Sequence, residues 1–504
     1  MRNPIRLIAL GAAGTMAAAL AVPALADAPT DTAQFRDAVT VEGVRDHQAA
    51  LQAIADANGG TRASGTPGYD ASVEYVTDTL IEAGYQVSQQ DFDYELFLVN
   101  APSVLDPTSP DLAPYVDDED FTVMEYSGEA DVTAAVQAVD LTLPPTAAPS
   151  STSGCEAADF AGFTAGNIAL MQRGTCTFRE KADFAAAAGA VGAIIFNEGQ
   201  EGRTDLLSGT LSPPQAGIPV VGTTFEVGDE IAGLAASGLT VRLATDVEVR
   251  PETTTNVIAD SPSGRTDRTL VVGAHLDSVL EGPGINDNGS GSAAILETAE
   301  ELADLDGTRN AVRFTFWGAE ESGLIGSQHY VDQLTARQLK NIHAYLNFDM
   351  VGSPNFVRFV YDGDGSTFGV SGPNGSGHIE QTFVDYFASQ ELASEPTQFD
   401  GRSDYDAFIN AGVPAGGLFT GAEGIKTAEQ AAIYGGTAGL AYDPCYHQAC
   451  DTFANNSTTG LDQMTDAVAH ATLLFAQTKS AINGTGEATS TSGEAAFRGH
   501  AAVK

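Results

Sequence analysis

Histidine and carboxylate side chains follow a series of short apolar runs in the second half of the chain, each close to the point where a run ends. Neutral imidazole and carboxylate oxygens are the ligands that zinc takes in catalytic sites. Two zinc ions about 3.5–4 Å apart need one carboxylate that bridges them and two further ligands each. Five residues satisfy this count, with the second of them as the bridge: His275, Asp287, Glu321, Asp349 and His447.

Each of these residues has an ordinary structural explanation when it is taken alone. A histidine after a strand is more often a structural hydrogen-bonding residue, and a lone acid at a strand end is usually a helix cap. Adjacent acids such as Glu320 and Glu321 are usually a solvated pair. The glycine-rich loop 284–289 lacks the lysine and the spacing of a phosphate-binding loop. The five positions together, in strand order, favour the metal-site interpretation.

The elements that must position these residues alternate between strands and helices. Apolar runs at residues 269–274, 311–317 and 342–348 predict buried strands, and the spacing of apolar residues over 290–305 predicts a helix. This alternation is typical of an α/β domain, and we expect a three-layer α/β/α sandwich with a mixed, largely parallel central sheet. Open sheets of this kind bind ligands beyond the carboxyl ends of their strands, where the candidate residues stand.

A chain of 504 residues is too long for one ordinary domain. Residues 155–244 read as a separate module, with three short strands, one alanine-rich helix and no catalytic spacing. We expect this module to be inserted into the α/β domain. The expected divisions are 36–124 and 246–482 for the discontinuous α/β domain, 125–245 for the mainly-β insert, and 483–504 for a disordered tail.

The start of the chain predicts export. A basic, then apolar and alanine-rich stretch ends at Ala24-Leu25-Ala26, so residues 1–26 are interpreted as a cleaved signal peptide, with an uncleaved membrane anchor as the alternative. The formal net charge of −44 repels nucleic acid and anionic membrane surfaces, which excludes both as partners. We expect a secreted, extracellular monomer with no membrane insertion after signal removal.

Four cysteines are consistent with an oxidising compartment. Three pairings are formally open, and proximity in sequence favours Cys155 with Cys176 and Cys445 with Cys450. A zinc site built from all four thiolates is the competing interpretation, which the wide gap between the two pairs disfavours.

Several segments of the chain resemble the M28 family of zinc aminopeptidases. The resemblance covers essentially all of the chain outside the signal segment, the middle module and the tail, and the middle module resembles the protease-associated domain. The family segments are GTPGYDAS (65–72), GAHLDS (273–278), GINDNGSG (284–291), FWGAEESGLIGS (316–327), NFDMVGS (347–353), GRSDYDAF (401–408) and CYHQACD (445–451), and those of the module are GCEAADF (154–160), IALMQRGTCTF (168–178) and GAVGAIIFN (189–197).

The resemblance implies a secreted enzyme with two zinc ions that removes the amino-terminal residue, large and apolar, from peptides and proteins with a free amino terminus. It implies that His275, Asp287 and Asp349 hold one zinc, and that Asp287, Glu321 and His447 hold the other. It assigns the remaining roles as follows: Glu320 is the general base that acts on the metal-activated water, Tyr446 donates to the oxyanion, and Arg402 binds substrate.

Asp277 stands two residues after His275, where its carboxylate is expected to accept the second imidazole N–H and fix the tautomer. The other histidines are interpreted as structural or surface residues. They are His47, His329, His343, His378, His470 and His500.

The chain departs from the family at two places. Tyr405 stands where a relative has histidine, so we expect a different pocket wall. Asp462 and Asp466 fit half of a family calcium site, but Ala38 stands where the other acid is expected, which leaves calcium doubtful. The alternatives are a carboxypeptidase or a glutaminyl cyclase on the same scaffold, or a non-catalytic binding protein.

Overall fold

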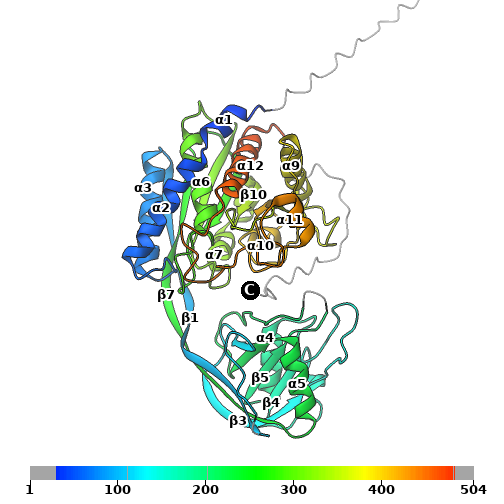
Figure 1. The fold of residues 1–504 in the computed structure, drawn as a ribbon. Helices are drawn as coiled ribbons and strands as arrows, with labels where there is room; N and C mark the ends of the chain where they lie inside the picture. Colours follow the sequence, from blue (N-terminus) through cyan, green and yellow to red (C-terminus); the bar gives the residue numbers. More distant parts are fainter. Residues whose placement is uncertain (1–29, 111, 201–202, 481, 483–504) are drawn as a thin grey trace, which may run out of the picture.

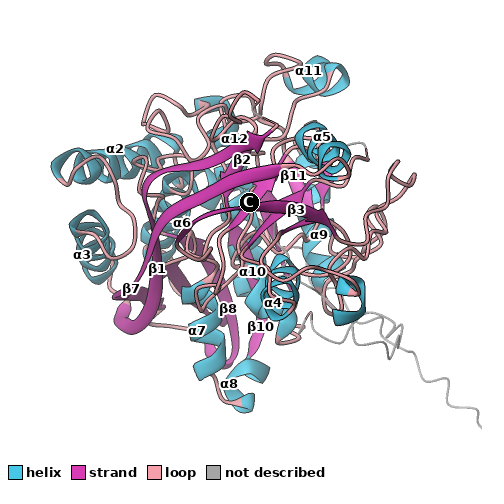
Figure 2. Cartoon of the chain, turned by 90° about the horizontal axis from the view of Figure 1, so that it is seen from below, coloured by secondary structure: helices cyan, strands magenta, loops and turns pink. Residues whose placement is uncertain are grey.

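The computed structural model describes residues 30–110, 112–200, 203–480 and 482, and it forms two lobes joined by a long two-stranded ribbon (Figure 1). The ribbon consists of strands β1 (Gln86–Ser109) and β7 (Thr240–Asp260), which pair antiparallel along their whole length. The expected signal peptide, tail and His500 lie outside the described residues. The chain therefore enters and leaves the small lobe along neighbouring strands, which run together in Figure 2.

The large lobe is built on a mixed sheet with the strand order β12-β11-β13-β10-β8-β9-β7. The four central strands β13, β10, β8 and β9 are parallel, whereas β7 and β11 are antiparallel to their central neighbours. The three strands predicted from apolar runs are confirmed as its centre. The bounds are β8 Arg265–His275, β9 Asn310–Trp317, β10 Ile342–Phe348, β11 Phe359–Tyr361, β12 Glu395–Thr397 and β13 Ala415–Phe419.

Helices cover both faces of this sheet, which confirms the three-layer sandwich. Alternate residues of β8 pack on opposite faces: Val272 packs in a core with Ile295 of α6, and Val271 in a core with Phe408 of α10. The first face carries α1 Ala33–Ala38, α2 Val41–Ala57, α3 Pro67–Glu82, α6 Gly289–Ala303, α9 Ser376–Ser389 and α12 Thr458–Gln477; the second carries α7 Ile325–Gln333, α8 Ala336–Asn341 and α10 Tyr405–Asn410, with α11 Ala428–Tyr434 beyond β13.

The small lobe continues the sheet, because β3 pairs antiparallel with the far end of β7. Strands β3, β4, β5 and β6 are parallel, and β2 is antiparallel to β6. Apolar cores lie on both faces, one under α4 and one under α5. The bounds are β2 Phe121–Val123, β3 Ala130–Ala138, β4 Ile168–Gln172, β5 Gly192–Phe196, β6 Val220–Thr223, α4 Phe178–Ala187, α5 Phe225–Ala235 and the 3-10 helix η1 Ala157–Phe160.

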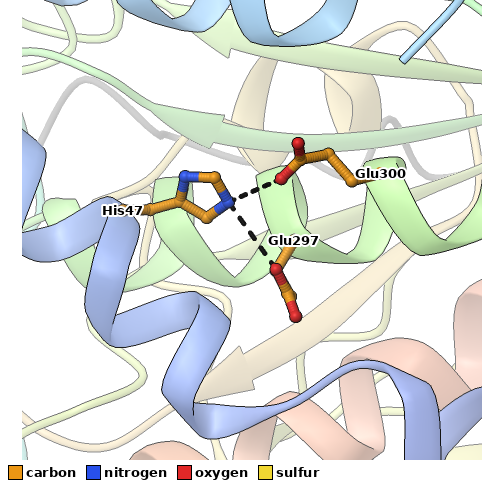
Figure 3. A group of neighbouring side chains, drawn as sticks. All are labelled: His47, Glu297 and Glu300. Carbon is orange, nitrogen blue, oxygen red and sulfur yellow. Dashed lines mark ion pairs between the residues drawn. The ribbon is translucent and has the colours of Figure 1, made fainter. Parts of the chain in front are cut away.

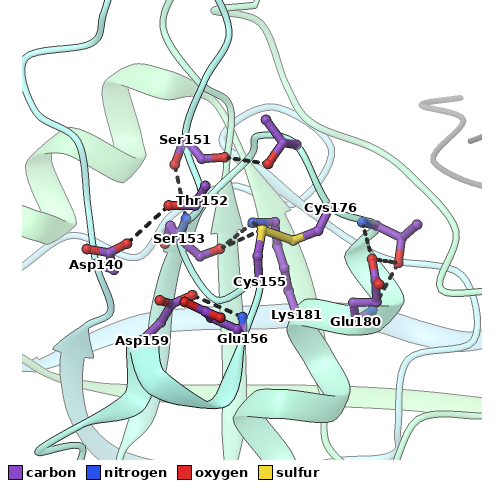
Figure 4. Close-up of a disulfide and its surroundings, with 12 residues drawn as sticks. Asp140, Ser151, Thr152, Ser153, Cys155, Glu156, Asp159, Cys176, Glu180 and Lys181 are labelled. Carbon is purple, nitrogen blue, oxygen red and sulfur yellow. Dashed lines mark hydrogen bonds between the residues drawn. A yellow bond between two sulfur atoms is a disulfide. The ribbon is translucent and has the colours of Figure 1, made fainter. Parts of the chain in front are cut away.

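A disulfide between Cys155 and Cys176 joins the loop before β4 to the start of α4 (Figure 4). The buried side chain of Lys181 lies beside it, donates to the carbonyl of Ser153, and stands 3.7 Å from the Cys155 sulfur. Burial lowers the pKa of this lysine to about 8. The second predicted pair is confirmed as well, because Cys445 and Cys450 form the other disulfide, so no thiolate is available for a zinc site.

Among the residues that the structure describes, no helix combines the length and the apolar composition that crossing a bilayer requires.

Candidate metal centre and active site

The predicted site residues converge at the carboxyl ends of the parallel strands. His275 is the last residue of β8, Asp349 follows β10 directly, and Glu320 stands three residues beyond β9. Asp287 lies two residues before α6 begins, and His447 lies in the short loop that the Cys445–Cys450 disulfide closes. The structure therefore brings the candidate residues together at this edge of the sheet.

Asp287 lies between the two imidazoles and presents one carboxylate oxygen to each. Its Oδ1 is 3.2 Å from His275 Nε2, and its Oδ2 is 3.2 Å from His447 Nε2. Asp349 Oδ1 lies 3.3 Å from the same nitrogen of His275, and Glu321 Oε2 lies 3.1 Å from that of His447. The result is two groups of three donor atoms that share a single aspartate, with the atoms of each group within 4.8 Å of one another.

The donor set fits zinc in type, number and charge. Each group offers one imidazole nitrogen and two carboxylates, which are ligands of catalytic zinc sites. Burial favours the neutral form of His275, but the charges of Glu320 and Asp349 outweigh it and raise the pKa of this imidazole well above its ordinary value. The pKa of His447 is likewise raised to about 10 against its burial, mainly by Glu321. Negative charge gathers around both nitrogens, as a site for cations requires.

Polar side chains surround the two donor groups. His275 Nδ1 is 3.2 Å from the backbone oxygen of Asp277 and 3.5 Å from its carboxylate, and the effect of Asp277 on the tautomer stays a prediction. Ser403 donates to Asp349 Oδ2 at 2.6 Å, and Asn347 donates to Ser403 at 2.8 Å. Ser403 and Asn347 were missed as site residues, although both belong to the segments that carry the family resemblance.

Asp451 connects the backbone at Asp287 with the loop that carries His447. Its carboxylate accepts the backbone N–H groups of Asn286 at 2.8 Å and Asp287 at 2.9 Å, and it directly follows Cys450. Asp451 was missed as a site residue, although it ends the family segment at 445–451, because its partners lie 165 and 164 residues away. One carboxylate therefore fixes the bridging aspartate and the second disulfide loop together.

The fully buried side chain of Arg62 supports the loop between β8 and α6, which carries Asp287. Its guanidinium donates to the backbone carbonyls of Pro283 at 2.9 Å and Gly284 at 2.6 Å, and also to that of Leu276. Burial lowers the pKa of Arg62 to about 10, against the charges of Asp277 and neighbouring acids, so it is a cation at neutral pH. It places positive charge beneath the carboxylate cluster.

A pocket opens beside the two donor groups, with Glu320 in its wall. One carboxylate oxygen of Glu320 lies 4.0 Å from His275 Nε2, and the side chain is buried. Burial raises the pKa of Glu320 well above its ordinary value. The lining residues are His275, Asp287, Glu320, Glu321, Asp349, Met350, Tyr361, Thr397, Gln398, Asp400, Arg402, Ser403, Phe419, Ala422 and Tyr446.

Arg402 and Tyr446 form one side of this pocket. The guanidinium of Arg402 donates to Glu423 at 2.6 Å and to the hydroxyl of Tyr446 at 3.3 Å. The ring of Tyr446 stacks on that of His447, with centroids 3.8 Å apart. Tyr446 is therefore held from two sides, by the guanidinium of Arg402 at its hydroxyl and by the imidazole of His447 against its ring.

The structure also places three other residues that the sequence analysis named. Tyr405 does not line the pocket; it is buried and packs edge-on behind Tyr361, at a centroid distance of 4.7 Å. Asp466 pairs with Arg36 at 3.8 Å. His47, interpreted from the sequence as a structural or surface residue, lies between two glutamates of α6 (Figure 3).

Comparison with known proteins agrees with this fold. Residues 256–472 match the model of Peptidase family M28, and residues 138–231 match that of the PA domain. An aminopeptidase of Pseudomonas aeruginosa is 52% identical over 424 residues, which are 84% of this chain and 78% of the relative. Leucine aminopeptidase 2 of Trichophyton equinum is 41% identical over 432 residues, covering 85% and 82%.

Solved structures show the same architecture. The aminopeptidase from Aneurinibacillus sp. strain AM-1 is 27% identical, with a TM-score of 0.71 over 90% of this chain and 98% of that one. A zinc aminopeptidase from Bacillus subtilis is 25% identical, with a TM-score of 0.61 over 88% and 97%.

Fold and site together define a metallopeptidase of the α/β/α class with an inserted protease-associated domain. The chain belongs to peptidase family M28 and is a zinc aminopeptidase, a hydrolase that acts as an exopeptidase.

Proposed function

We propose that the enzyme holds two zinc ions and removes large apolar residues from the amino termini of peptides and proteins. The position of Asp287 carries this proposal, because its two oxygens face two different imidazoles at equal distances of 3.2 Å. His275 and Asp349 would complete one coordination group, and Glu321 and His447 the other. Zinc bound there supplies a water of lowered pKa and polarises the scissile carbonyl.

The side chains around that position then have distinct tasks. Glu320, whose pKa burial raises, takes a proton from the attacking water and returns it to the leaving amine. Tyr446 donates its hydroxyl proton to the oxyanion that forms on the substrate, and Arg402 keeps that hydroxyl oriented. Asp277 holds His275 in the tautomer whose Nε2 is free to bind metal.

The charge of the pocket favours an amino terminus over a carboxyl terminus as the recognised group. Among the described residues that line it, Arg402 is the one lysine or arginine, and its guanidinium is already paired with Glu423. Of the lining carboxylates, Glu320 and Asp400 are not assigned to zinc, and these attract a substrate ammonium group and repel a substrate carboxylate. This supports an aminopeptidase over a carboxypeptidase, and the names of the relatives agree.

The preference for large apolar residues rests on the remaining wall of the pocket. Met350, Tyr361, Phe419 and Ala422 present apolar surface there, and burying an apolar side chain against such a wall is favourable. One group of relatives is named for leucine.

We also propose export by a signal peptide at 1–26, with the insert spanning 125–245 and the peptidase domain spanning 36–124 and 246–482. Two disulfides support an oxidising compartment.

Metal titration with a base-deficient variant tests the function. The chelated enzyme should regain leucyl-p-nitroanilide hydrolysis as zinc reaches two ions per chain. Glu320→Gln should keep both ions yet lose about 10²–10⁴-fold in kcat, the usual contribution of a general base. Glu429→Gln, on the exposed surface of α11, is the matched control. Full activity at one zinc per chain, or cleavage that requires a free carboxyl terminus, would refute the proposal.

A further inference from the structure

A tyrosine of the inserted lobe contacts the loop that carries the proposed general base. Tyr126 belongs to the apolar core of the small lobe and is 1% exposed. Its hydroxyl lies 2.7 Å from the backbone oxygen of Glu95 in β1 and 3.1 Å from that of Ser322. Ser322 directly follows Glu320 and Glu321, so a side chain of one lobe reaches the catalytic loop of the other.

The segment from Gly318 to Leu324, between β9 and α7, is here called the base loop. Its first half is fixed by side chains of the large lobe, which accept its backbone N–H groups. Ser64 accepts from Ala319 at 2.7 Å, and Asp277 accepts from Glu320 at 3.3 Å. Its second half turns back on itself, with the N–H of Leu324 donating to the carbonyl of Glu320 at 2.8 Å.

The backbone of the base loop is strained at two positions. Ala319 has φ of 51° and Leu324 has φ of 61°, in the left-handed region that residues with a side chain rarely adopt. Such conformations persist only where surrounding contacts hold them. The contact from Tyr126 to Ser322 lies between these two strained residues.

Tyr126 is itself held in an unusual conformation. Its φ is 60°, again in the left-handed region, and its carbonyl accepts the N–H of Ala216 at 2.7 Å. Its ring lies 5.8 Å from that of Phe97 in β1. The small lobe therefore fixes both the backbone and the ring of Tyr126, which leaves the hydroxyl a defined place against the base loop.

We propose that Tyr126 is a positioning residue through which the inserted lobe sets the geometry of the base loop, and with it the carboxylate of Glu320. The inference rests on the proposed role of Glu320. The single O–H proton of Tyr126 is shared between the backbone carbonyls of Glu95 and Ser322. The hydroxyl therefore holds the ribbon strand β1 and the base loop together. Loss of the hydroxyl releases the Ser322 end of the loop and lets the proposed base move from its working position.

Tyr126→Phe tests this inference because it removes only the hydroxyl. We expect kcat for leucyl-p-nitroanilide to fall about tenfold, since misplacement of a catalytic group by about 1 Å can cost up to 10²-fold. KM and the zinc content should stay within twofold of the wild type. Tyr115→Phe is the matched control, because Tyr115 also lies between β1 and β3 in the sequence and its buried hydroxyl has no hydrogen-bond partner among the residues that the structure describes.

A double-mutant cycle separates positioning from general destabilisation. If Tyr126 acts through Glu320, then Tyr126→Phe should cost little in a Glu320→Gln background, because the group that it positions is already absent. Hydrogen exchange of peptides that span 318–325 should increase in Tyr126→Phe and not in Tyr115→Phe, and this measurement stands even if the variant is less stable.

The possible failures are distinguishable. An unchanged kcat in Tyr126→Phe, or a full tenfold loss that persists in the Glu320→Gln background, overturns the positioning role while leaving the proposed function intact. A Glu320→Gln enzyme with wild-type turnover overturns the proposed function itself.

Discussion

His47 links helix α2 to helix α6, and its titration should make the stability of the large lobe depend on pH. Its Nε2 lies 2.9 Å from Glu300 Oε2 and 3.7 Å from Glu297 Oε2 (Figure 3). Its Nδ1 lies 2.7 Å from the hydroxyl of Tyr75. Burial favours the neutral imidazole, but hydrogen bonds to the two glutamates outweigh it and raise the pKa of His47 to about 9. The folded protein therefore holds a buried imidazolium there at neutral pH.

The size of the effect follows from that pKa. A rise from the ordinary value of 6.5 to about 9 corresponds to about 3.4 kcal/mol, since one pKa unit is worth about 1.36 kcal/mol. The side chain of Glu300 is 38% exposed, so water screens its charge, and we expect about 1–2 kcal/mol. Because the folded pKa lies above the unfolded one, this contribution is complete below pH 6.5 and is lost as pH rises through about 9. Tyr75, whose pKa burial raises to about 12, stays neutral over this range.

Urea unfolding of the wild type and His47→Gln at pH 6 and pH 9.5 measures this contribution. The difference in free energy of unfolding between the two proteins should be about 1–2 kcal/mol larger at pH 6 than at pH 9.5. An equal difference at both pH values, or one that grows as pH rises, would refute the reasoning, as would an NMR titration that gives His47 a pKa near 6.5.

Three further predictions concern the active site. Ser403→Ala removes the hydroxyl that donates to Asp349 at 2.6 Å, so zinc affinity measured by competition with a chelator should fall about 10–100-fold; unchanged affinity would contradict the role of this contact. Arg402→Met should lower kcat about tenfold, because the tyrosine hydroxyl loses a hydrogen bond from a cation worth about 1.5–3 kcal/mol, and an effect on KM alone would contradict this. The double variant Cys445→Ser/Cys450→Ser should lower the free energy of unfolding, measured by calorimetry, by about 2 kcal/mol, because the loop that the disulfide closes is short. It should lose zinc and activity to a greater extent than stability. Full retention of zinc would contradict the role of the disulfide as a support of the site.

The parts of this molecule that could be predicted from sequence are those in which short-range pattern and topology act together. Apolar runs predicted the central strands, and the end of a parallel strand is a fixed place in the fold, so His275, Asp349 and Glu320 could be placed at one edge before any coordinates. Spacing likewise favoured the disulfides that the structure contains.

The supports of the site could not be predicted in the same way. Asp451 accepts from backbone groups more than 160 residues away, and an aspartate in a loop carries no local sign of such a partner. His47 is one of several histidines on helices, and only the packing of α2 on α6 shows that it faces two glutamates. Contacts of this kind depend on which helix faces meet. The periodicity of apolar residues indicates which face of a helix is buried, but it does not indicate which other helix packs against that face.

Both connections between the large lobe and the small lobe run through the paired strands of the ribbon. Because Leu96 stands opposite Arg250 in register, a tight turn placed near that pair would close the peptidase chain into an ordinary hairpin without crossing any other segment. The insertion thus leaves the winding of the host domain unaltered. An enzyme engineered to lack the small lobe would keep the same strand order in its sheet, and would lose only the contacts that the small lobe makes with the peptidase domain.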